Sequence, residues 1–119
     1  MVDVAVHHDN VVFTIQGAHK VFALKNQLTI PRAHVTGVRP DPEAAQHIEG
    51  LRAGGTHVPG VITAGTFYLD NQGSQKPSFL DVSNPANTVV IALRNEEYHQ
   101  LIIEVKDPEA VVALLAISG

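Results

Sequence analysis

Short runs of β-branched and aromatic residues, each ended by glycine, proline, asparagine or aspartate, recur along most of this 119-residue chain. Such runs are typical of β-strands bounded by turns. The run 88–93 is apolar on both faces, so it predicts a central strand buried on both sides. A bulge is expected at Gly37 and an interruption at Gly65. The expected strands are residues 3–7, 11–15, 28–30, 34–39, 61–69, 77–82, 88–93 and 98–105.

The clearest helix signal is near the C-terminus. Asp107 is a good N-cap, and Pro108 suits the first helical position. Val111, Leu114 and Leu115 then form one apolar stripe, so a helix is expected to pack here. Residues 18–25 and 42–48 predict two shorter helices.

Composition restricts the function more than it identifies it. The chain has no cysteine, which excludes disulfides, thiolate zinc sites and cysteine nucleophiles. Its net charge of -4 argues against a broad nucleic-acid surface. The length predicts a single domain over residues 1–119. The longest apolar run has 8 residues, whereas a membrane span needs about 20. We therefore expect a cytoplasmic protein.

The order of the segments resembles a bacterial pleckstrin-homology-like domain. The matching pieces are residues 17–24, Leu28-Thr29-Ile30-Pro31 with Ala33-His34-Val35 and Val38, Gly60, Ala64-Gly65-Thr66-Phe67, Thr88-Val89-Val90-Ile91 and Asp107-Pro108-Glu109. The resemblance implies a mainly β fold with one helix. About seven antiparallel strands would form two nearly orthogonal sheets in a partly open barrel, capped by the C-terminal helix.

The same resemblance implies a binding and assembly scaffold without shared catalytic residues. Eukaryotic relatives of the fold often bind phosphoinositides through a basic loop between the first two strands. Here that loop is His7-His8-Asp9-Asn10, which has no lysine or arginine. We therefore expect no phosphoinositide binding. With a negative net charge, association with an anionic membrane is not expected either.

A glycine-rich segment, Gly50–Gly60, is read as the main loop of the protein. Gly54 and Gly55 could offer backbone N–H groups to an anion, and Arg52 and His57 could add positive charge. The segment lacks the lysine and hydroxyl residue of a P-loop. Two interpretations stay open, a purely conformational loop or a binding site for a small anionic ligand or a partner.

Catalytic and metal-binding patterns are weak. The serines lack a nucleophile-elbow sequence, and Glu96-Glu97 are expected to be solvated in a turn. Adjacent His7 and His8 would point to opposite faces of an extended strand, so they do not predict a metal site. A site assembled from the distant His34, His47 and His57 stays open. We expect no enzyme activity, cofactor or metal.

These observations predict a non-enzymatic module that binds a protein partner or a second copy of itself. A homo-oligomer joined through an open sheet edge or the glycine-rich segment is the leading hypothesis. The alternative is a small anionic-ligand binder, or a minor enzyme, that uses Arg52, Gly54, Gly55 and His57.

Overall fold

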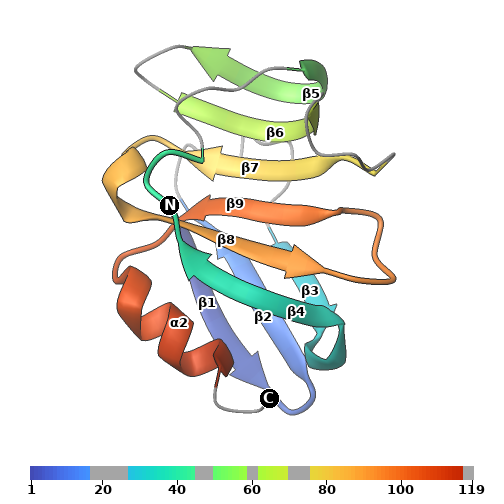
Figure 1. Cartoon of the computed structure of the whole chain (residues 1–119), viewed down its shortest axis with the longest axis vertical. Coiled ribbons are helices and arrows are strands. Elements are labelled where there is room, and N and C mark those ends of the chain that lie inside the picture. Colours follow the sequence, from blue (N-terminus) through green and yellow to red (C-terminus); the bar gives the residue numbers. More distant parts are fainter. Residues whose placement is uncertain (17–26, 45–49, 59–61, 70–75, 117–119) are drawn as a thin grey trace.

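A computed structural model describes residues 1–16, 27–44, 50–58, 62–69 and 76–116 of the chain (Figure 1). It is mainly β, with two sheets and a C-terminal helix. The strands are Val2–His7 (β1), Asn10–Ile15 (β2), Gln27–Pro31 (β3), Val35–Pro40 (β4), Gly50–Val58 (β5), Ile62–Leu69 (β6), Ser78–Val82 (β7), Thr88–Leu93 (β8) and Gln100–Glu104 (β9). The helix α2 spans Pro108–Ala116, and two 3-10 turns cover Arg32–His34 (η1) and Pro85–Asn87 (η2).

The smaller sheet is an antiparallel meander of β1, β2 and β3. In β2, buried Val11, Phe13 and Ile15 alternate with the more exposed Asn10 and Thr14. This period of two is what one-sided burial of a strand requires. One face of the small sheet therefore supplies apolar side chains to the core.

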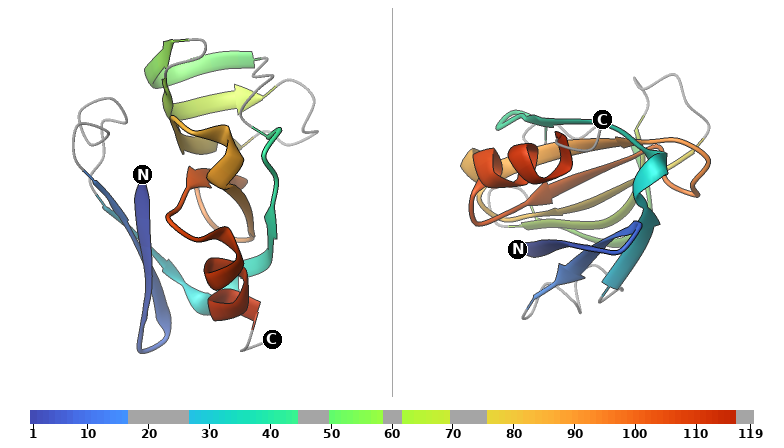
Figure 2. Two further views of the ribbon diagram at one scale, coloured as in Figure 1. Left: turned by 90° about the vertical axis from the view of Figure 1, so that its left-hand side faces the viewer. Right: turned by 90° about the horizontal axis from the view of Figure 1, so that it is seen from below.

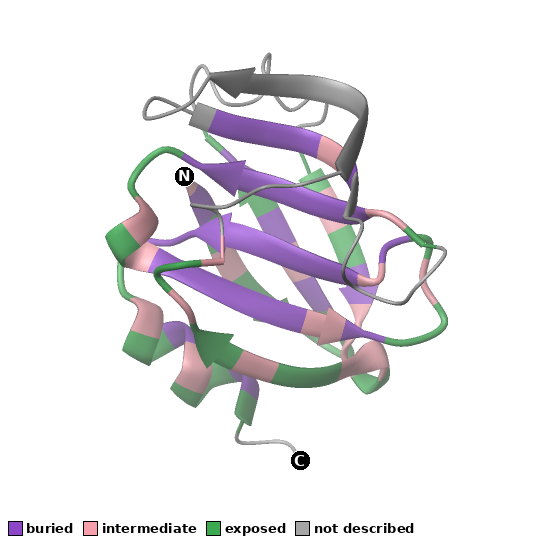
Figure 3. Cartoon of the chain, turned by 45° about the horizontal axis from the view of Figure 1, so that its top comes forward, coloured by how far each residue is buried: buried purple, intermediate pink, exposed green. Residues whose placement is uncertain are grey.

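The larger sheet has the order β4-β8-β9-β7-β6-β5. β9 follows β8 in the chain but lies between β7 and β8, antiparallel to β8 and parallel to β7. The central strands are buried along their length (Figure 3). The expectation of purely antiparallel sheets is therefore wrong at β7 and β9, because a strand from later in the chain is inserted there.

Apolar side chains of the larger sheet form two cores, one on each face. On β9, Leu101 and Ile103 belong to the core shared with the small sheet and α2, whereas Ile102 belongs to the core on the opposite face. The chain beyond β4 reaches that opposite face, where Ala44 packs against the second core. The two sheets pack together but do not close into a barrel (Figure 2). Of the predicted partly open barrel, the structure therefore shows two packed sheets.

Helix α2 begins as the sequence predicts. The carboxylate of Asp107 accepts a hydrogen bond from the Ala110 amide at 3.2 Å. At the other end, the Arg32 guanidinium donates to the Leu115 carbonyl, where positive charge complements the helix dipole. Val111 and Leu115 are buried, but Leu114 is 37% exposed, so the predicted apolar stripe is narrower than expected.

The local structure agrees with the sequence-based expectations at some positions and differs at others. The register shift between Val35 and Gly37 confirms the bulge. Gly65 does not interrupt β6, because the strand runs through it at a φ of 127° that favours glycine. The predicted helix 18–25 lies outside the described residues. So does most of 42–48, whose first residues form a turn in which the Glu43 amide donates to the Asp41 carboxylate.

The Gly50–Gly60 loop is the largest error in local structure. Residues Gly50–Val58 form β5, which pairs with β6 at both ends and on both sides of a register shift at Ala53. Glycine has a low intrinsic propensity for β-strands. Hydrogen bonding to the neighbouring strand β6 outweighs this low propensity here.

Substitution Asp107→Ala should lower the free energy of unfolding by about 1 kcal/mol, because it removes the side chain that accepts the Ala110 amide. Asp107→Asn is the matched control, since asparagine caps helices about as well. Thermal unfolding of both variants measures the difference. Equal loss in the two would contradict a capping role.

Candidate functional site

The four residues predicted as a site, Arg52, Gly54, Gly55 and His57, all lie on β5. Their Cα partners on β6 are Phe67, Thr66, Gly65 and Thr63 respectively. The register shifts between Arg52 and Gly54, so Ala53 is an extra residue on the β5 side. The structure thus brings these residues together, but along an extended strand and not around a loop.

This geometry changes what the two glycines can do. In an antiparallel ladder, successive N–H groups alternate between the paired side and the open side of a strand. An anion cradle needs successive N–H groups to converge on one point. A strand at Gly54 and Gly55 therefore favours backbone pairing with another strand over capture of a small anion.

β5 is also an edge. Within the part of the chain that the structure describes, its pairing partner is β6. Figures 1 and 2 place β5 and β6 at one end of the molecule, beyond the small sheet. The outer N–H and C=O groups of an edge strand form a template for a further strand.

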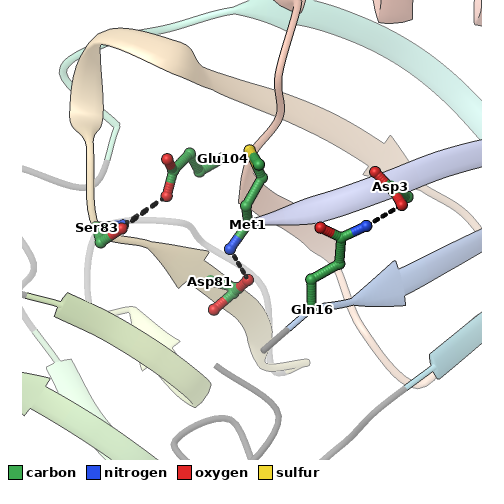
Figure 4. Close-up of polar contacts among 6 residues, drawn as sticks. All are labelled: Met1, Asp3, Gln16, Asp81, Ser83 and Glu104. Atoms are coloured by element: carbon green, nitrogen blue, oxygen red, sulfur yellow. Dashed lines mark hydrogen bonds and ion pairs between the residues drawn. The ribbon is translucent and has the colours of Figure 1, made fainter. Parts of the chain in front are cut away.

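A second cluster of polar side chains lies where β7 and β9 end (Figure 4). Asp81 on β7 is fully buried, and its carboxylate lies 3.2 Å from the Met1 ammonium. Glu104 on β9 is 8% exposed. Its Oε1 accepts hydrogen bonds from the Ser83 amide at 3.0 Å and the Ser83 hydroxyl at 2.9 Å.

The environment of Glu104 determines its charge. Burial by itself raises the pKa of its carboxyl group. The amide and hydroxyl of Ser83, the Asn84 backbone and the Met1 ammonium together outweigh burial and hold that pKa below its ordinary value. Glu104 is therefore ionised at neutral pH and bonded to its neighbours. A general acid at neutral pH needs a raised pKa, so this arrangement favours a structural role.

Asp81 and Glu104 were not among the residues expected to matter. Each is nevertheless the one acid in a strand that also contains three apolar residues. A buried carboxylate is expected to have specific partners. A buried side-chain amide likewise needs a hydrogen-bond partner. The Gln100 amide donates to the Ser78 hydroxyl at 3.0 Å in the buried β7–β9 pair.

The histidines differ from their predicted arrangement. His7 and His8 do not point apart, because their ring centroids are 4.5 Å from each other. The His34 ring bonds through Nδ1 to the carboxylate of Glu96, which is half-buried and not solvated as predicted. His47 lies outside the described residues, and the side chain of His57 is likewise not described. Across the described ranges, no three histidine, aspartate or glutamate side chains form a group that could hold a metal.

Comparisons with known proteins do not add a family. No protein-family model, curated protein or solved structure matches the chain. None of the helices in the described segments is long and apolar enough to cross a membrane.

Substitution Glu104→Gln should make the protein less stable at neutral pH by about 1 kcal/mol, the difference between hydrogen bonds to charged and to neutral acceptors. Because the folded pKa of Glu104 is lowered, its stabilisation is present above the unfolded pKa and is lost as pH falls through the folded pKa. The difference between variant and parent should thus shrink in acid. Denaturant unfolding at several pH values measures this.

Glu43→Gln is the control for that experiment, because Glu43 is an exposed acid. It should follow the parent protein across the same pH range. A Glu104→Gln deficit that persists unchanged in acid would contradict the assignment.

Proposed function

We propose that this protein is a non-enzymatic binding or self-assembly module that pairs through the outer edge of β5. The observation that carries the proposal is a nine-residue strand at the end of a six-stranded sheet, paired with β6 in the described part of the chain. Strand addition at such an edge gains main-chain hydrogen bonds without requiring a preformed pocket.

The sequence of β5 supports this use. Natural edge strands are commonly blocked by lysine, proline or inward-pointing charge. Gly50–Val58 contains neither lysine nor proline, and Arg52 is the one residue of it with a permanent charge. The extra residue at Ala53 disturbs the ladder locally. The regular stretch offered to a partner is therefore Gly54–Val58.

The pleckstrin-homology-like affiliation is part of this proposal. The features that support it are the initial meander of β1 to β3 and the C-terminal helix α2 packed beside a sheet. The parallel pairing of β7 with β9 is a departure from what the resemblance implies. Under this proposal the turn between β1 and β2 binds no inositol lipid, because it has no lysine or arginine.

The test of self-assembly is light scattering coupled to size-exclusion chromatography over a range of concentrations. We expect a discrete oligomer. A monomer at every concentration would contradict self-assembly and leave capture of a different protein as the remaining form of the proposal.

Two proline variants locate the contact. Thr56→Pro and His57→Pro each remove one backbone N–H, and consecutive N–H groups face opposite sides of β5. One variant should lose its ladder bond to β6 and be destabilised, whereas the other should fold normally and be monomeric. Arg52→Ala is the control, because Arg52 lies on the far side of the bulge. This variant should have the same oligomer mass as the parent protein in light scattering. An oligomer that survives both substitutions would contradict pairing through β5.

The alternative hypothesis, an anionic-ligand site at Arg52 and His57, predicts a different result. Phosphates, sugars and nucleotides would raise the melting temperature, and Arg52→Ala would abolish the increase. The strand geometry of Gly54 and Gly55 leads us to expect no such increase.

A further inference from the structure

The tip of the β1–β2 hairpin brings two imidazole rings together. His7 is the last residue of β1 and His8 begins the turn, and both side chains are exposed. Their ring centroids lie 4.5 Å apart with an interplanar angle of 57°. Two adjacent residues of a regular strand would have placed these rings on opposite faces.

The backbone of this turn departs from a regular strand at His8. His8 has a φ of 57°, in the left-handed region that glycine or asparagine would occupy with less strain. The turn is held from β3 and η1, because the Arg32 amide donates to the Asp9 carbonyl at 2.8 Å. A strained residue that survives in a short turn is a reason to ask what its side chain does.

The ring centroids are close enough for one metal ion to be bound by both imidazoles. With metal–nitrogen bonds of about 2.0–2.1 Å, the centre of an imidazole lies about 3.2 Å from the ion it binds. Two rings at a right angle about an ion are then about 4.5 Å apart, and two at the tetrahedral angle about 5.2 Å. The observed 4.5 Å between the centroids is compatible with the right angle of tetragonal Cu²⁺ and Ni²⁺ sites.

We propose that His7 and His8 form a binding site for a tetragonal divalent transition metal, with Cu²⁺ held more tightly than Ni²⁺ or Zn²⁺. The order follows the general preference of nitrogen ligands for Cu²⁺. In the described segments no third histidine or carboxylate joins them to complete a cluster, so the remaining coordination positions are open to solvent.

The charges around the hairpin tip are compatible with a cation. Asp9 follows His8 directly and adds negative charge. The Arg32 amide bonds to the Asp9 carbonyl, but the Arg32 guanidinium is directed to the Leu115 carbonyl at the end of α2.

The experiment is a calorimetric titration of the whole chain with Cu²⁺ at about pH 7.5, in the presence of glycine as a competing chelator. Loss of a metal's outer-shell partner already weakens binding about 10- to 100-fold, so His7→Gln and His8→Asn should each weaken it at least that much. Asparagine tolerates the left-handed backbone, so His8→Asn retains the turn. Electron paramagnetic resonance of the parent complex should show two nitrogen ligands from histidine.

His99→Gln is the matched control, because His99 lies on the turn before β9 and should leave the affinity unchanged. If the double variant His7→Gln/His8→Asn binds Cu²⁺ as tightly as the parent, the proposal is wrong. The hairpin tip and β5 lie at opposite ends of the molecule (Figure 1), so this result is independent of the oligomer test.

Discussion

Burial of β9 on both faces is the constraint on which the rest of the structure depends. Leu101 and Ile103 fill the core shared with the small sheet, and Ile102 fills the core on the other side. The strand also provides the pairing surface for both β7 and β8. Without β9, these two strands would have no common neighbour, and each core would lose the apolar side chains that β9 contributes.

Two polar contacts hold β9 in one register. Near its start the Gln100 amide bonds to Ser78, and at its end Glu104 accepts from Ser83. A slip of one residue would exchange the two apolar faces and also separate both polar pairs. A carboxylate buried without partners is far less stable than one in water. These contacts therefore contribute specificity of pairing in addition to stability.

The positions of most strands and the start of α2 could be predicted, because they depend on residues close together in the sequence. β-branched runs located β1 to β4 and β6 to β9, and Asp107-Pro108 located the start of α2. The strand order was not predictable, because nothing in residues 100–104 specifies a parallel partner 22 residues earlier. The candidate residues Arg52, Gly54, Gly55 and His57 lie along one strand, β5. They were expected in a loop, because the low strand propensity of glycine can be read from the local sequence. Pairing with β6 depends on the tertiary structure and cannot be read there. The left-handed His8 likewise has no signature in composition.

The insertion of β9 also affects how the chain can fold during synthesis. β7 and β8 leave the ribosome before the strand that separates them, so a direct β7–β8 hairpin would occupy the place that β9 needs. The larger sheet is complete only after the last strand has emerged, and until then two apolar strand edges remain open. Pairings between segments far apart in sequence slow folding. Until β9 pairs with both β7 and β8, those edges can pair with the strands of other chains.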